Sequence, residues 1–336
     1  MCADWKVLNC VLGLGAANSK IYCPWCLGTK DERTGAQPQS NAVERHNVWQ
    51  DIVDGEVEII EYGHINLPLL PAISPEQIWI DLLHLFLRIT DTLLGLLMED
   101  IVAMCVGADK SKIVYAFEQA SIAAGAHIHL EDKDGKLSWP PLMGDQRERL
   151  FRNLDLTAVL SAQRGAATRA LWNEFLSIME IAKSRELLTQ DMIEQFRTKV
   201  QDWVTRLTAP STGAMHDPSY RGGMYSSARV TPYMHALTKH VPDQLQRAGQ
   251  LGQPLSRLNC EPVEKMHHLQ NRLFFARTSM DGGHGKRRSS ATKALMRMEN
   301  RRTLAMATPP LESGATPKPK ILRGFRKRSR GAKVTV

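Results

Sequence analysis

The chain has 336 residues, enough for a sizeable buried core and about two domains. Its hydrophobic content of 43% is ordinary for a globular protein. Six cysteines in a chain of this length do not suggest a dense disulfide framework, and the opening MCADWKVLNC lacks the basic start and apolar run of a signal peptide. We therefore expect a reducing, intracellular environment.

The net charge of +8 is divided unevenly along the chain. Residues 285–336 hold 15 Lys or Arg and 2 Glu, a charge of +13, which leaves −5 for the other 284 residues. A mildly acidic body with a strongly basic end favours a polyanionic partner such as a nucleic acid. The alternative is a solvated tail that only keeps the protein soluble. The basic residues expected to contact DNA are Lys286, Arg287, Arg288, Arg301, Arg302, Arg326, Lys327 and Arg328.

The first 74 residues predict little regular structure. Residues 4–14 form a short ordered element, helix or strand, and residues 16–74 are expected to be irregular around the motif Cys23-Pro-Trp-Cys26. A helix is then predicted from Ser74 to about Val106, because Ser74 can cap it, Pro75 suits its first position and Gln77 completes a capping box.

The predicted helix after Ser74 is apolar over the length of a membrane span, but it carries polar residues at spacings of 3, 4 and 3: Asp81, His84, Arg88 and Asp91. Charged side chains are costly in lipid, so we expect a buried helix and no membrane partner. The polar residues share one stripe, which should meet partners inside the protein or line a cleft. The simplest such partnership is a salt bridge, Asp81–Arg88 or Arg88–Asp91.

Further helices are predicted in the second half of the chain. Their expected ranges are 111–125, 164–183, 190–207, 231–241, 261–280 and 290–306, with a loop at 208–230. The residue before Pro242 disfavours helical backbone, so the helix from Thr231 should stop near Val241. The Pro-, Gly- and Lys/Arg-rich end is expected to be disordered.

Two short motifs could form a metal site. Cys23 and Cys26 have the spacing at which one turn presents two thiolates to a Zn²⁺ ion, and His235 and His240 are the best candidates for the other two ligands. On a regular helix, two residues that are five positions apart direct their side chains away from each other. A break in the helix before Pro242 could turn His240 back toward His235. The alternatives are a redox pair, or a turn and a helix end that are unconnected.

Two carboxylates lie near these motifs in the sequence. Asp4 precedes Cys23, and Glu264 follows His240. If a metal ion joined the two half-sites, it would bring the surroundings of Asp4 and Glu264 together. Paired carboxylates near a basic surface suit Mg²⁺- or Mn²⁺-dependent phosphoryl transfer on DNA. Asp4 can equally be read as a helix cap.

The order of these motifs resembles the catalytic core of the V(D)J recombinase large subunit and of Transib-type transposases. The shared blocks are an acid, CPWC, a Pro-capped helix with IDLLHLFL, YMHALTKHVP and VEK, spread over residues 4–280. The resemblance implies an RNase H-like (DDE) fold with a large helical insertion that a zinc ion ties to the helix bearing the last Glu. By motif, Asp4 and Glu264 match catalytic carboxylates, with Glu261 as a second candidate.

The resemblance also assigns the zinc ligands to Cys23, Cys26, His235 and His240, and implies DNA as substrate, a homodimer and a nuclear location. The family's first catalytic Asp has no match here, so we expect a remnant or fragment of a DNA recombinase that is inactive alone. An upstream segment or partner chain could instead complete an active enzyme. The alternative from another class is a zinc-stapled helical interaction module without nucleic-acid function.

The expected fold class is mainly α, an incomplete RNase H-like core with a large helical insertion, a zinc site and a disordered basic tail. Four domains follow. They are residues 1–73 with the remnant core and the cysteine half-site, 74–230 with the helical insertion, 231–284 with the histidine half-site and the catalytic Glu, and 285–336 with the basic tail.

Overall fold

The structure is a computed structural model that describes residues 1–34, 43–104, 110–212, 222–262, 264–266, 269–271 and 291–307. The chain divides into two compact units, Met1–Glu264 and Lys265–Val336. Helices dominate the described residues, so the mainly α prediction is confirmed. The strands among them form one antiparallel hairpin far from Asp4 in sequence, and an RNase H-like core therefore stays a prediction.

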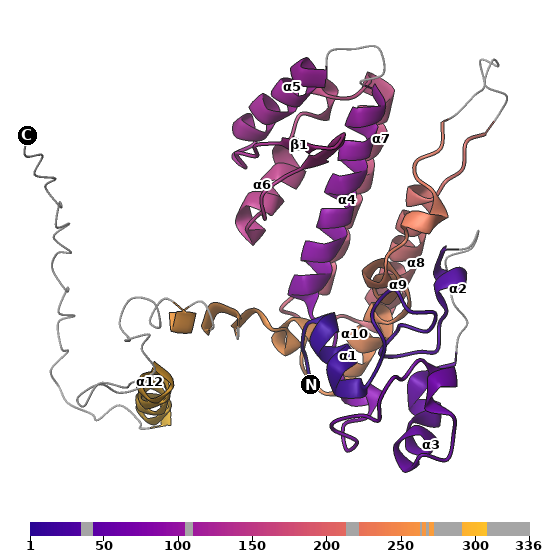
Figure 1. Cartoon of the computed structure of the whole chain (residues 1–336), viewed down its shortest axis with the longest axis vertical. Helices are drawn as coiled ribbons and strands as arrows, with labels where there is room; N and C mark the ends of the chain where they lie inside the picture. The colour runs from indigo at the N-terminus through magenta and orange to yellow at the C-terminus, as the bar shows by residue number, and fades with distance from the viewer. Residues whose placement is uncertain are drawn as a thin grey trace, which may run out of the picture. The chain divides into compact units, whose positions relative to one another are not determined.

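The first unit is built from helices of very different lengths (Figure 1). The longer helices are α1 (Trp5–Leu12), α4 (Leu82–Met104), α5 (Lys110–Ala123), α6 (Gly144–Asn153), α7 (Ala162–Ala182), α8 (Gln190–Leu207), α9 (Pro232–Lys239) and α10 (Val241–Gln250). The short elements are α2 (Lys30–Thr34), α3 (Trp49–Asp54) and the strands β1 (Glu131–Lys133) and β2 (Lys136–Ser138). In the second unit, α12 spans Ala291–Ala307.

Side-chain caps fix the beginnings of three helices close to where the sequence predicts them. The side chains of Ser161, Thr189 and Thr231 accept hydrogen bonds from backbone N–H groups in the first turns of α7, α8 and α9. Each bond satisfies a donor that has no partner within the helix itself. Pro232 occupies the first turn of α9, where its missing N–H costs nothing.

The long helix α4 begins seven residues later than predicted. Gln77 does accept a hydrogen bond from the Ser74 N–H, but the helical turn from Pro75 is short and Ile78 is extended, with ψ of 126°. The following backbone is bonded elsewhere: Trp79 N donates to Met1 O, and Ile80 N donates to the side chain of Gln244. These distant partners hold residues 78–80 extended, so the prediction of a helix from 75 was wrong.

Beyond residue 74, two further α-helices and the hairpin lie in segments where no helix or strand was predicted. The helix α10 follows α9 directly, with Pro242 in its first turn, so the predicted stop near this proline is a bend between two helices. In the hairpin, Asp134 and Gly135 have positive φ angles of 52° and 82° and form the tight turn between the strands. The third element is α6, which packs on α7.

The core of the first unit runs along α4 and α7, which lie side by side over most of their length (Figure 1). Phe86 and Phe175 join the two helices through stacked rings 6.2 Å apart, and Trp203 of α8 continues the aromatic contact at 5.3 Å from Phe175. Apolar burial of this kind supplies most of the stability of long helices. These helices form the frame on which the candidate site is placed.

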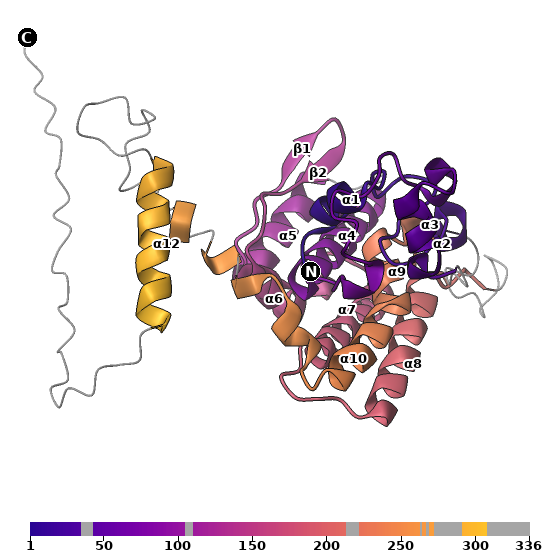
Figure 2. The ribbon, with the colours of Figure 1, turned by 90° about the horizontal axis from the view of Figure 1, so that it is seen from below.

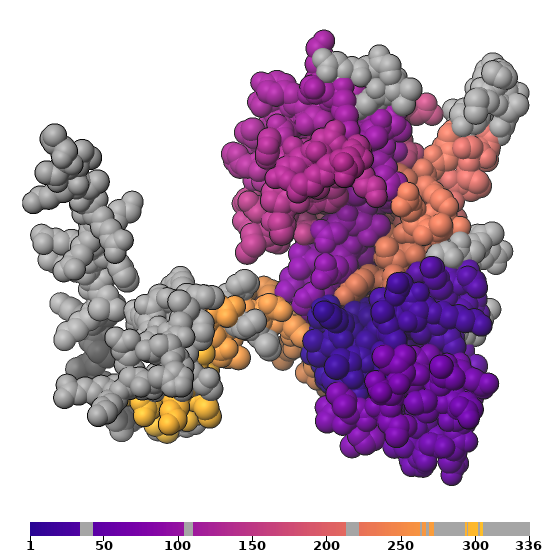
Figure 3. Space-filling model, in the orientation of Figure 1, coloured from indigo at the N-terminus to yellow at the C-terminus, as the bar shows by residue number. Residues whose placement is uncertain are grey.

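Residues 1–74 cover one end of this frame. Seen from below, α1, α2 and α3 (indigo) lie near α9 (Figure 2). In the space-filling view, the indigo and purple residues of this part adjoin orange residues from the second half of the chain (Figure 3). The expected irregular stretch 16–74 thus includes short helices. Among the described residues, no helix combines the length and apolar character needed to cross a membrane.

Candidate metal centre

The two predicted half-sites lie together in the structure. The Sγ atom of Cys23 lies 3.3 Å from Nε2 of His240, and the Sγ atom of Cys26 lies 3.4 Å from Nε2 of His235, across sequence separations of 217 and 209 residues. All four ligand atoms lie within 4.8 Å of one another, and all four residues are buried. This donor set is close enough to hold a metal ion such as zinc.

The turn Cys23-Pro-Trp-Cys26 is held in shape by a neighbouring strand-like segment. Residues 43–45 run antiparallel to residues 25–27, with hydrogen bonds from Leu27 N to Val43 O and from Arg45 N to Trp25 O. Gly28 N also donates to the Cys26 sulfur at 3.4 Å. These bonds hold the turn in a shape from which both sulfurs reach the histidine pair.

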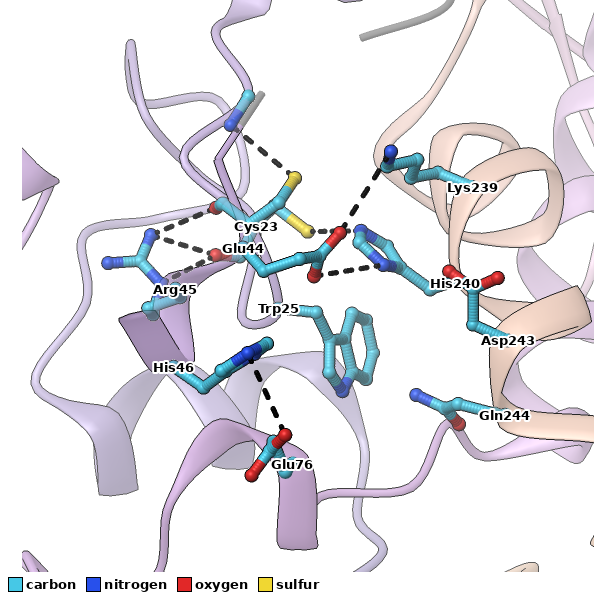
Figure 4. Close-up of polar contacts among 12 residues, drawn as sticks. Cys23, Trp25, Glu44, Arg45, His46, Glu76, Lys239, His240, Asp243 and Gln244 are labelled. Carbon is cyan, nitrogen blue, oxygen red and sulfur yellow. Dashed lines mark hydrogen bonds and ion pairs between the residues drawn. The ribbon is translucent and has the colours of Figure 1, made fainter. Parts of the chain in front are cut away.

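The buried guanidinium of Arg45 fastens the same turn from behind (Figure 4). It donates to the carbonyl oxygens of Cys23 at 2.8 and 3.1 Å and of Cys26 at 3.3 Å. It also reaches Tyr62 O and Nε2 of His64. Burial lowers the pKa of Arg45 to about 10, so it stays charged at neutral pH.

His64 extends this network toward α1. Burial, followed by the charge of Arg45, lowers the pKa of His64 to about 4, so its imidazole is neutral at pH 7. The assigned hydrogen bonds then fix the tautomer, with Nε2 accepting from Arg45 and Nδ1 donating to Leu12 O at 2.8 Å. The turn Cys23–Cys26 and the end of α1 are thereby linked through two side chains.

The histidine half-site depends on the bend between α9 and α10. His235 lies within α9, and His240 lies between α9 and α10, just before Pro242. The two imidazole rings are 5.2 Å apart, although five residues separate them in sequence. The break at this proline therefore does turn His240 back toward His235, as the sequence suggests.

Glu44 supports one of the two histidines. Its carboxylate lies 4.0 Å from Nδ1 of His240, on the opposite side of the ring from Cys23, and 3.9 Å from Lys239 (Figure 4). Burial, followed by the charge of Cys26, raises the pKa of Glu44 to about 7. Metal-binding histidines commonly direct their second nitrogen at a carboxylate, which fixes the ring orientation and raises ligand basicity. The equivalent Nδ1 of His235 is buried and has no hydrogen-bond partner among the described residues.

The electrostatic surroundings of two of the four side chains, His240 and Cys26, suit metal binding. Burial lowers the pKa of His240, which keeps its imidazole neutral and available as a ligand. A hydrogen bond from the Cys23 thiol lowers the pKa of Cys26 well below the usual thiol range, whereas burial raises the pKa of Cys23. Two thiolates and two neutral imidazoles are the donor set of closed, four-coordinate structural zinc sites.

The two predicted catalytic carboxylates come to one neighbourhood. Asp4 stands at the first position before α1, where its side chain makes no cap bond and instead accepts from the Tyr233 hydroxyl at 3.0 Å. Glu264 is half-buried, and its N–H donates to Cys260 O. The hydrogen bond that His84 donates to Asp81 is the main cause that raises the pKa of His84, and the charges of Asp4 and Glu264 raise it further.

These carboxylates do not complete a metal site within the described residues. Among the described residues, two groups of potential metal ligands have their ligand atoms close together. One is the set of Cys23, Cys26, His235 and His240, and the other contains neither Asp4 nor Glu264. Asp4 lines a cavity together with Lys6, Arg88 and Tyr233. Glu261, the second candidate, is exposed. The catalytic role of these acids stays a prediction.

The polar stripe of α4 does meet partners inside the protein. Asp81 is buried and pairs with His84 rather than forming the expected bridge to Arg88. Asp91 is paired mainly with the buried Arg147 of α6, and its contact with Arg88 is long, at 3.9 Å. The second of the two expected salt bridges, Arg88–Asp91, is thus present, and the buried Arg147, from a helix that the sequence did not predict, is an additional partner of Asp91.

Two of the predicted DNA contacts lie within the described residues. Arg301 and Arg302 are on α12, and Arg301 is exposed. The other six lie outside the described part of the chain: Lys286, Arg287, Arg288, Arg326, Lys327 and Arg328. The predicted helix 261–280 is helical at 261–262, 264–266 and 269–271, and the tail beyond 307 also lies outside the described residues.

Comparison with known proteins adds no relative. No protein-family model matches the chain, and no curated protein matches it. The metal-centre geometry therefore carries the functional argument. The sequence missed Arg45 and Glu44, because an Arg or Glu in an irregular segment bears no local mark of burial beside a metal ligand.

Proposed function

We propose that the chain is a transposase-derived protein in which one structural zinc ion joins residues 23–26 to residues 235–240. The observation that carries the proposal is the meeting of two cysteines and two histidines, more than 200 residues apart in sequence, in a buried cluster. A closed set of four N and S donors favours zinc in a structural role. This arrangement is also the one that the resemblance to DDE recombinases implies.

DNA is the proposed partner, and the nucleus is the proposed location. Support comes from the charge of +13 on residues 285–336 and from the nearness of Asp4 and Glu264 to the same histidine. Two carboxylates could hold a Mg²⁺ or Mn²⁺ ion for phosphoryl transfer if a further ligand completed the site. We assign this chain DNA binding, and cleavage only when that ligand is supplied.

Retention on immobilised DNA at increasing salt tests the DNA assignment. The full chain should be retained at low salt and released steeply as salt rises, because each phosphate contact releases counterions. A variant that ends at residue 284 should lose most of this retention. Failure of the full chain to bind at low salt would leave the zinc-stapled interaction module as the better assignment, whatever its zinc content.

A further inference from the structure

A second cluster of metal-binding side chains lies apart from the cysteine–histidine centre. Its members are Cys2, Asp81 and Cys260, and their ligand atoms all lie within 4.8 Å of one another. Cys2 pairs with the backbone of Trp79, Asp81 directly precedes α4, and Cys260 directly precedes the helical residues that lead to Glu264. Three distant parts of the first unit thus contribute one donor each.

The spacing of the two sulfur atoms is that of ligands sharing an ion. The Sγ atoms of Cys2 and Cys260 are 3.5 Å apart. Two sulfurs bound tetrahedrally to zinc at ~2.3 Å lie about 3.8 Å apart. A disulfide brings them to about 2.05 Å. The observed separation resembles the contacts of 3.3 and 3.4 Å within the cysteine–histidine centre.

The carboxylate of Asp81 is held in a fixed orientation beside these sulfurs. It is only 3% exposed, and its Oδ1 accepts from the backbone N–H groups of Leu83 at 3.2 Å and Cys260 at 3.1 Å. Its Oδ2 pairs with Nδ1 of His84. Carboxylates that bind metals are usually oriented by such outer hydrogen bonds, which leave a lone pair directed at the ion.

We propose that Cys2, Asp81 and Cys260 bind a second zinc ion, separate from the one at Cys23 and His240. Three protein ligands leave a fourth position for water or another small ligand, which is the pattern of an open zinc site. Binding releases the thiol protons of both cysteines. The ion ties the N-terminal segment to the start of α4 and to the residues before Glu264, and so fixes Asp4 and Glu264 relative to each other.

Metal stoichiometry of the full chain, purified under reducing conditions and loaded with zinc or with cobalt(II), tests this site. The wild-type chain should hold two ions, and Cys2→Ser and Cys260→Ser should each hold one. Cys10→Ser is the matched control, because Cys10 is exposed and belongs to neither cluster, and it should keep two ions. Cobalt loading should also show thiolate-to-cobalt absorption that weakens in Cys2→Ser.

The outcomes separate this site from the first one. A wild-type chain with one ion that Cys2→Ser retains overturns the second site. So does a Cys2–Cys260 disulfide, found by peptide mapping without reductant, in a chain that keeps one ion. If the wild-type chain holds a single ion that is lost in Cys2→Ser but kept in Cys26→Ser, the second site is supported and the cysteine–histidine site is contradicted. Circular dichroism of each variant shows whether the fold is retained.

Discussion

Arg45 is fully buried and donates hydrogen bonds to three carbonyl groups and to a histidine ring. Two of these carbonyls belong to Cys23 and Cys26. A buried carbonyl that loses its donor costs free energy because water cannot replace the lost bond. We therefore expect this side chain, together with the backbone bonds of residues 43–45, to keep the two sulfurs in the orientation that a metal ion needs.

Arg45→Met tests this dependence. The change keeps most of the side-chain volume but leaves the carbonyls of the turn unpaired, so we expect a loss of roughly 2–4 kcal/mol in unfolding free energy and weaker zinc binding. Chemical denaturation and competition with a chelator measure the two effects. Arg152→Met is the control, because Arg152 is exposed and paired only with surface acids, and it should stay within about 0.5 kcal/mol of wild type. Equal effects in both variants would contradict the assignment.

Glu44→Gln isolates the support that His240 receives. The amide keeps the size of the side chain but loses the negative charge beside Nδ1, so zinc affinity should fall by about 10- to 100-fold. Glu76→Gln is the matched control. Glu76 lines the same surface cavity as Glu44 and His240, but its carboxylate pairs with His46. Affinities come from competition with a coloured chelator. If Glu44→Gln bound zinc as tightly as Glu76→Gln does, the carboxylate would have no role at the metal.

At the scale of elements, the first turn of α4 carries a titrating pair. The hydrogen bond that His84 donates to Asp81 raises the pKa of His84 above its usual value. Burial by itself would raise the pKa of Asp81, but the hydrogen bonds from His84 and from two backbone N–H groups, together with the charge of His84, lower it. A raised folded-state pKa gives stability that is complete below the unfolded value of 6.5 and is lost as pH rises through the folded value. The pair therefore stabilises the start of α4 most at mildly acidic pH.

His84→Gln removes this dependence while keeping a hydrogen-bond donor for Asp81. Between pH 6 and pH 9, the melting temperature of the wild-type chain should fall relative to that of the variant. Thermal melts across this range measure the difference, and zinc loss does not interfere because the ligands are more deprotonated at high pH. Parallel pH curves for the two proteins would show that the pair does not couple to folding.

The elements also show which sequence signals are sufficient. Helical periodicity located α8, and Thr231 with Pro232 located the start of α9, because both signals act on the backbone next to them. The cap at Ser74 did not locate α4, because Trp79 and Ile80 bond to Met1 and Gln244, which no local pattern reveals. Propensity and capping are local, and tertiary hydrogen bonds override them.

At the scale of the whole molecule, the metal centre was the most predictable feature. The spacing of Cys23 and Cys26 suggested a metal half-site, and His235 and His240 were the best candidates for its other ligands, a set that the family resemblance then assigned without knowledge of the fold. The cluster of Cys2, Asp81 and Cys260 could not, because its members are single residues with no shared motif. Only the folded chain brings them together.

Removal of zinc should destabilise the entire first unit. An ion that binds the folded chain at 1,000 times its Kd contributes about 4 kcal/mol, all of which a strong chelator removes. We expect the melting temperature to fall on chelation and to recover when zinc is restored. Cys23→Ser should melt at a lower temperature before any chelator is added. If the chelator left the melting temperature of the wild-type chain unchanged, the four cysteine and histidine residues would hold no structural ion.

The separation of the two half-sites in the sequence also determines how long after the cysteines the histidines are synthesised. The 209 residues between Cys26 and His235 take about 10 to 40 s to synthesise at 5–20 residues per second. For that interval, the nascent chain presents a thiol pair whose partners do not yet exist. The helices α4 to α8 emerge in the meantime and can pack on one another first. Closure of the metal centre is therefore a late event, and until then the two cysteines are open to oxidation or to the wrong metal.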